Sequence, residues 1–149
     1  MRLEEEIKQP RFGNEHHKAI VNILYTSSWL SNKNIAFLKG FNVSPEQFNV
    51  LRILRGSHPS PMRLTDIADR MIEKNSNCTR LVEKLRQKGM VERKLCESNR
   101  RQVDISITAT GLKALAAIDR EEGQWLSVQK SITKTEAAEL NRILDKLRS

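Results

Sequence analysis

Cysteine, aromatic residues and long apolar runs are all scarce in this sequence. The 149 residues include only 2 cysteines, and aromatic side chains make up 5% of the chain. Two cysteines are too few for a disulfide scaffold, and no apolar run is long enough to span a bilayer. The N-terminus also lacks the charged-then-apolar pattern of a signal segment. We therefore expect a cytoplasmic protein in a reducing compartment.

Motifs of catalysis and metal binding are missing as well. The sequence has no Gly-x-Gly-x-x-Gly, no phosphate-binding loop with its lysine, no nucleophile elbow and no His-Glu-x-x-His helix. The 3 histidines include the neighbours His16 and His17. On a helix these two point about 100° apart and cannot bind one ion together. We expect no enzyme, no cofactor and no metal.

Positive charge is abundant and unevenly distributed. Lysine and arginine total 26 against 18 acidic residues, which gives a formal net charge of +8. Residues 76–102 hold eight positive and three negative side chains, so about a fifth of the chain carries a net +5. A basic patch alone suits DNA, RNA or an anionic lipid surface.

Two short amphipathic helices are predicted in the middle of the chain. Their apolar residues recur at the i, i+3, i+4, i+7 spacing of a buried stripe. The two stripes are Leu64, Ile67, Ala68 and Met71, then Cys78, Leu81, Val82 and Leu85. The connector of residues 72–76 is short, so the helices must pack at a steep angle.

The second of these helices has a polar outer face. The face opposite its stripe carries Ser76, Thr79, Arg80, Glu83 and Gln87, flanked by Asn77 and Lys84. A major-groove helix needs such residues, because Arg pairs with guanine and Asn or Gln with adenine. A helix face that is only exposed to solvent would have the same composition. The segment that follows must therefore distinguish a recognition helix from a solvent-exposed one.

A basic hairpin is predicted after the second helix. Gly89 supplies a C-cap for that helix, and residues 91–95 and 103–107 alternate apolar with polar side chains, as strands do. The turn between them carries Arg100 and Arg101, which can enter a narrow minor groove or clamp a phosphate. Two helices and a basic hairpin in this order predict a winged helix-turn-helix that binds duplex DNA.

Further helices are predicted on both sides of this lobe. An apolar helix precedes it, and a capping box at Ser44 starts a helix that runs to about Arg55. A long helix runs from Ala109 to about Lys130, and a capping box at Thr133 starts the last one. Apolar residues of the last two helices are Leu112, Leu115, Ala116 and Leu126, then Leu140, Ile143, Leu144 and Leu147. The apolar stripe of the last helix must be buried, either against its own domain or against a second copy of the chain.

The sequence resembles the MarR (multiple antibiotic resistance regulator) family of winged-helix transcription regulators. The resemblance rests on residues 78–85, 88–93 and 107–111, and residues 44–51 are similar to the family's second helix. It implies a mainly α fold with a small β-wing and a single MarR-like domain over residues 1–149. The winged helix-turn-helix lobe would span about residues 44–111.

Two positions depart from the family's wing signature. Asn99 stands where Asp is usual, and Ile107 stands where Leu is usual. The second change is minor. The first removes a carboxylate that could hold Arg101, which predicts a looser wing tip or another partner such as Glu97.

Further expectations follow from the resemblance. The terminal helices, about residues 15–40 and 109–149, would interlock two chains in a homodimer. Such a dimer would present two recognition helices to the half-sites of a pseudo-palindromic operator, as a repressor would. A small aromatic or phenolic effector could release it. Candidate pocket residues, equally suited to the core, are Tyr25, Trp29, Phe37, Phe41 and Phe48.

Twelve residues are predicted to contact DNA. Those expected at or near bases are Ser76, Asn77, Thr79, Arg80 and Glu83; those expected at phosphates are Lys84, Arg86, Lys88, Arg93 and Lys94; and those at the wing tip are Arg100 and Arg101. Glu83 is expected to orient Arg80 at i−3 or to accept from a cytosine amine.

Two other classes of function remain open from the sequence. One is a nonspecific architectural or RNA-binding protein, and the other is a helical adaptor for an acidic partner protein. Redox sensing is not expected. Cys78 lies on a core stripe, and Cys96 lies near the wing, where basic neighbours could lower the pKa of its thiol.

Overall fold

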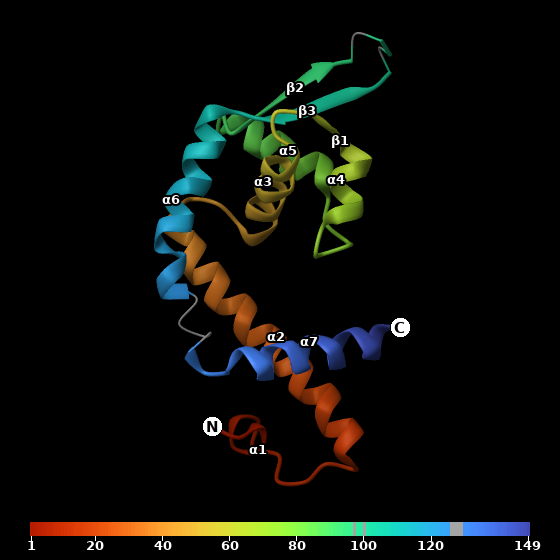
Figure 1. The fold of residues 1–149 in the computed structure, drawn as a ribbon, viewed down its shortest axis with the longest axis vertical. Helices are drawn as coiled ribbons and strands as arrows, with labels where there is room; N and C mark the ends of the chain where they lie inside the picture. Colours follow the sequence, from red (N-terminus) through yellow and green to blue (C-terminus); the bar gives the residue numbers. More distant parts are fainter. Residues whose placement is uncertain (97, 100, 126–129) are drawn as a thin grey trace. The chain divides into compact units, whose positions relative to one another are not determined.

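The computed structural model describes residues 1–96, 98–99, 101–125 and 130–149, without the side chains of residues 122–125. Two compact units make up the chain, Met1–Asn42 and Val43–Ser149. The prediction of a mainly α fold with a small β-wing is confirmed (Figure 1). Among the described residues, no helix has the length and apolar character needed to cross a membrane.

The first unit consists of a short helix and a long one. Helix α1 spans Leu3–Glu6 and α2 spans Glu15–Lys39. The Asn14 side chain caps α2 by accepting from the His17 backbone N–H at 2.8 Å. The Tyr25 hydroxyl donates to the Glu6 carboxylate at 2.8 Å, which ties the two helices together. Several large apolar side chains of α2 are exposed, namely Ile20, Ile23, Leu24, Trp29 and Ile35.

The second unit holds the predicted pair of short helices on a third one. Helix α3 spans Pro45–Ser57, and the capping box at Ser44 starts it as predicted. Helices α4, Leu64–Arg70, and α5, Cys78–Gln87, both pack against α3. The fully buried side chains at the centre include Val50, Leu51, Leu54, Ile67, Val82, Leu85, Leu115 and Ile118. Of these, Ile67, Val82, Leu85 and Leu115 belong to the predicted stripes, whereas the stripe members Ala68 and Ala116 are exposed. Burial of Val82 and Leu85 fixes which face of α5 points outward.

The hairpin is part of a three-stranded antiparallel sheet. Strands β1, Met62–Arg63, β2, Val91–Leu95, and β3, Val103–Ile107, lie in the order β1-β3-β2. Figure 1 shows β2 and β3 projecting beyond the helices as the wing. Two short strands were predicted here, and β1 is an addition that pairs Met62 with Ile105. The base of the wing is therefore held from both sides of β3.

The Thr-x-x-Gly segment locks the start of α6, Ala109–Trp125, against the turn that follows α5. The Thr108 hydroxyl donates to the Gly89 carbonyl at 2.6 Å, and the Thr108 N–H donates to the Met90 carbonyl at 3.0 Å. The Gly111 N–H in turn donates to the Thr108 hydroxyl at 3.2 Å. A Cβ at Gly111 would lie 2.7 Å from Ile107 Cγ1 and closer still to the Met90 carbonyl oxygen. Only glycine fits this contact.

The last helix, α7, spans Lys134–Arg148 and begins at the predicted capping box on Thr133. None of its residues is buried. Its apolar stripe stays exposed, with Leu140 at 48%, Ile143 at 49% and Leu147 at 61% of full exposure. The predicted preceding helix was expected to reach about Lys130, but Leu126 lies outside the described residues and Lys130 is not in an α-helix.

Candidate nucleic-acid interface

The outer face of α5 is polar and open to solvent, as predicted. Cys78, Val82 and Leu85 are buried under it, whereas Thr79 and Arg80 are exposed. Burial raises the pKa of the Cys78 thiol, in keeping with a core role. A helix whose inner face is fixed by packing presents its outer side chains in a defined direction, which base recognition requires.

Ser76 and Asn77 are not on that helical face, so their predicted position is corrected. Helix α5 begins at Cys78, and Asn77 is its N-cap, with its side-chain oxygen accepting from the Arg80 N–H at 3.1 Å. The Ser76 hydroxyl oxygen is buried in the connector. Asparagine is among the best N-cap residues, so α5 starts directly after Asn77 and leaves Ser76 outside the helix.

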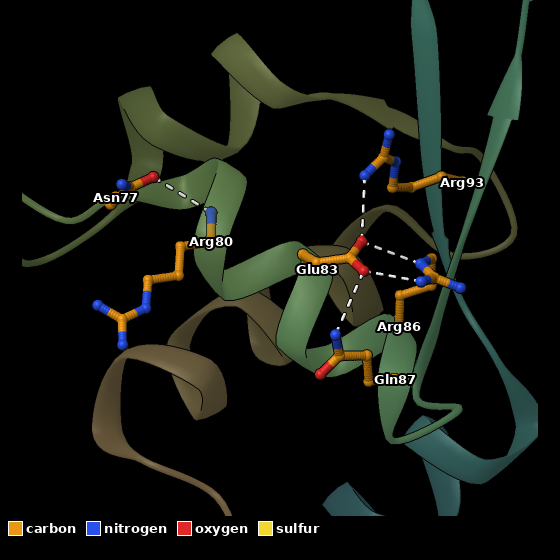
Figure 2. Close-up of polar contacts among 6 residues, drawn as sticks. All are labelled: Asn77, Arg80, Glu83, Arg86, Gln87 and Arg93. Carbon is orange, nitrogen blue, oxygen red and sulfur yellow. Dashed lines mark hydrogen bonds and ion pairs between the residues drawn. The ribbon is translucent and has the colours of Figure 1, made fainter.

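Glu83 lies at the centre of a cluster of cations on the same face (Figure 2). Its carboxylate accepts two hydrogen bonds from the Arg86 guanidinium, at 3.0 and 2.7 Å. Gln87 donates to it at 3.4 Å, and Arg93 from β2 donates at 3.3 Å. The Arg86 hydrogen bond lowers the pKa of the Glu83 carboxyl, and the charge of Arg93 acts in the same direction. The cluster joins the recognition helix to the wing.

The expected pairing of Glu83 with Arg80 at i−3 is therefore wrong. The Glu83 carboxylate faces Arg86, three residues later, and Arg93 across the helix–strand junction. Figure 2 shows the Arg80 side chain extending away from this cluster. Arg80 is left pointing outward from the N-terminal half of α5, where a recognition helix contacts base edges.

Lys84 of α5 and Lys88, the C-cap of that helix, lie in different surroundings. Lys84 is exposed, as expected of a phosphate ligand. Lys88 is part-buried, and its ammonium donates to Gln47 of α3 at 2.9 Å. Desolvation by burial lowers the pKa of Lys88. Lys88 thus fastens the end of α5 to α3, a packing role that the sequence did not indicate.

The wing tip is organised by Asn99. Its side-chain oxygen accepts from the Arg101 N–H at 3.1 Å, which closes a turn of the kind that asparagine and aspartate both form. Arg101 and Lys94 are exposed. The predicted wing residue Arg100 and the suggested partner Glu97 lie outside the described residues.

Cys96 precedes the wing turn, and the pKa of its thiol is lowered. The largest cause is a hydrogen bond with the Ser98 hydroxyl at 3.1 Å, followed by backbone N–H groups of the turn. The negative charge of Asp104 acts against this lowering. Turn geometry, and not the basic neighbours considered from the sequence, produces the shift.

The candidate pocket residues of the first unit fall into two separate groups, and the fifth candidate lies in the second unit. Tyr25 and Trp29 line a groove beside α1, and the Phe37 and Phe41 rings contact each other with centroids 5.4 Å apart. Phe48 belongs to the second unit, where Arg52 stacks over its ring.

Comparison with known proteins identifies the family of this lobe. The MarR family model matches residues 43–103, which include α3, α4, α5 and most of the wing. A MarR transcription factor from Planctomyces limnophilus is 29% identical over 93% of this chain and 98% of its own, with a TM-score of 0.70. The winged-helix lobe of this chain, residues 43–103, is therefore a MarR-family segment.

Two other MarR-like structures share the fold at lower identity. The regulator RdhR-CbdbA1625 in its 2,4-dichlorophenol-bound form is 20% identical, with a TM-score of 0.80, over 91% of this chain and 80% of its own. A mutant of S. aureus MepR bound to an oligodeoxyribonucleotide is 18% identical, with a TM-score of 0.59, over 87% and 94%. Among curated proteins, no relative matches the chain.

The family matched by residues 43–103, and the Planctomyces limnophilus protein, are transcription regulators and not enzymes. The matched segment contains Arg80, Glu83, Arg86 and Arg93. Besides the Lys88–Gln47 contact, sequence reasoning missed the bond from Arg93 to Glu83. The spacing of Glu83 and Arg86 was visible in the sequence, but nothing in it placed a strand residue beside them.

Proposed function

We propose that this protein is a cytoplasmic, homodimeric MarR-family repressor that binds a pseudo-palindromic operator in double-stranded DNA. The observation that carries the proposal is the outer face of α5. Thr79 and Arg80 project from a helix whose opposite face is packed into the core, and the basic wing lies beside it. This is the arrangement in which a recognition helix enters a major groove and a wing reaches the adjoining backbone or minor groove.

The homodimer is supported by apolar surface that one chain leaves uncovered. The α7 stripe of Leu140, Ile143 and Leu147 is exposed, and so are Ile20 and Leu24 of α2. Exposed apolar stripes of this kind mark interaction surfaces. A two-fold dimer formed through the terminal helices would space two α5 helices about one helical turn, roughly 34–36 Å, along the DNA.

Selection of binding sites from a pool of random duplexes tests this function directly. Enrichment of a palindrome with half-sites about one helical turn apart is the expected result. Binding that depends on salt but enriches no sequence would instead identify a nonspecific architectural protein. Preference for RNA over duplex DNA would favour the RNA-binding alternative, and no binding to either would favour the adaptor.

We also propose that a small aromatic or phenolic compound releases the repressor from DNA. The groove beside α1 contains Tyr25 and Trp29, which suit such a ligand, and a structural relative is known with 2,4-dichlorophenol bound. Titration of the protein–operator complex with substituted phenols should lower the anisotropy of a labelled operator. Unchanged anisotropy across a chemically varied set would overturn this part of the proposal.

A further inference from the structure

We propose that Glu83 is a positioning residue that holds Arg86 of α5 and Arg93 of β2 away from the DNA phosphates. We call these three residues the clasp. The inference rests on the proposed function, because it concerns how α5 and the wing meet DNA. In it, Arg86 and Arg93 are tied within the protein instead of serving as free phosphate ligands.

The hydrogen-bond inventory of the clasp supports this role. A carboxylate has about four acceptor sites on its two oxygens. Oε1 of Glu83 accepts from Arg86 and Gln87, and Oε2 accepts from Arg86 and Arg93. Four donors therefore occupy about four sites, which leaves no capacity for a cytosine amine. Reading a base, one of the two roles expected of Glu83, does not fit this geometry.

The charges of the clasp lead to the same conclusion. Two guanidinium groups and one carboxylate sum to a net +1 instead of the +2 of two free arginines. The paired atoms of Arg86, Nε and one Nη, form the planar fork that would otherwise bind a phosphate. The pKa of Glu83 is lowered mainly by Arg86, so the carboxylate remains charged at the neutral pH of a binding assay.

The consequence for recognition is a lower affinity for DNA of any sequence. Phosphate contacts carry no sequence information and supply nearly all of nonspecific binding. By withholding two arginines from phosphates, Glu83 reduces the background against which Arg80 and Thr79 read bases. Glu83 also connects α5 to β2 of the wing, so we expect the two elements to keep a fixed relative position when they contact the duplex.

The salt dependence of binding to random duplex DNA tests the clasp. Each additional phosphate contact adds about 0.9 to the slope of log affinity against log salt. We expect E83Q to steepen the slope by about 1 to 2 per protomer and to narrow the affinity gap between operator and random DNA. A loss of structure alone would weaken binding without steepening the slope.

The matched control is E139Q. Glu139 forms the same two-bond fork with the arginine three residues later, Arg142, at 2.9 and 2.6 Å. It lies on α7, which carries none of the predicted DNA-contacting residues. E139Q changes the net charge of the protein by the same amount as E83Q. Because it frees no arginine near the predicted DNA-contacting residues, the slope of log affinity against log salt should stay at the wild-type value.

A second pair of variants separates the clasp from a general charge effect. Arg93→Gln should leave the slope nearly unchanged in the wild-type background, where Arg93 is held by Glu83, and should reduce it in the E83Q background. Equal slopes for wild type and E83Q, or an equal rise in E139Q, would overturn the clasp while DNA binding itself stands. A wild-type protein that binds no duplex at any salt concentration would overturn the proposed function and the clasp with it.

Discussion

Replacing Gly111 with alanine tests the contact that holds the start of α6 against the turn after α5. The new Cβ would lie 2.7 Å from Ile107 Cγ1 and still nearer the Met90 carbonyl oxygen. That carbonyl is backbone and already accepts a hydrogen bond from the Thr108 N–H at 3.0 Å. It cannot move aside as a flexible side chain would, so α6 must shift or the hydrogen bond must lengthen.

Three terms determine the expected change in the free energy of unfolding. Overpacking costs about 1–3 kcal/mol, and a weakened hydrogen bond to Met90 adds about 1 kcal/mol. Against these, alanine gains about 1 kcal/mol over glycine within a helix. The net expectation for Gly111→Ala is a destabilisation of about 1–3 kcal/mol, or a melting temperature lowered by about 2–4 °C per kcal/mol.

Urea denaturation followed by circular dichroism measures this change, and Gly56→Ala is its matched control. Gly56 lies in α3, and nothing lies within 4 Å of the Cβ that alanine would add there. Propensity alone then applies, and Gly56→Ala should stabilise the protein by about 0.5–1 kcal/mol. We therefore expect the free energy of unfolding to fall for Gly111→Ala and to rise for Gly56→Ala. Gly111→Ala with a urea midpoint at or above the wild-type value would refute the steric reasoning.

Other changes address DNA binding, assembly and thiol chemistry. Arg80→Ala should cost about 1–3 kcal/mol on the selected operator and much less on random DNA, measured by fluorescence anisotropy at fixed salt; equal losses would mean that Arg80 contacts only the backbone. Ile143→Glu should convert a dimer to monomers in sedimentation velocity, because it puts a charge on the exposed stripe of α7, and an unchanged coefficient would exclude that surface. Ser98→Ala should raise the pKa of Cys96, seen as alkylation that begins at higher pH, with buried Cys78 slow in both proteins; an unaltered profile would contradict the role of the Ser98 hydroxyl.

Local patterns accounted for most of the fold in advance. The capping boxes at Ser44 and Thr133 start α3 and α7 where expected, because a cap depends only on residues three apart. Most of the two central apolar stripes likewise faces the core, with Ile67, Met71, Cys78, Val82 and Leu85 buried and Ala68 exposed. Helical periodicity and capping are properties of short segments, so the sequence alone reveals them.

Contacts between distant segments could not be predicted in the same way. Strand β1 is two residues long, and its pairing with β3 joins residues more than 40 positions apart. Lys88 meets Gln47 across 41 positions, and a surface lysine in a basic segment gives no sign of such a partner. The same holds for Arg93 beside Glu83, since only the angle between α5 and the wing brings them together.

The cap formed by Asn77 also constrains how operator preference can evolve in this protein. Its side-chain oxygen stabilises the first turn of α5, so most substitutions there would cost about 1 kcal/mol of stability whatever base they favoured. Thr79 and Arg80 have exposed side chains on the same helix and carry no such penalty. Among relatives that recognise different operators, divergence should therefore concentrate at positions 79 and 80, while position 77 stays within the small set of residues that cap a helix.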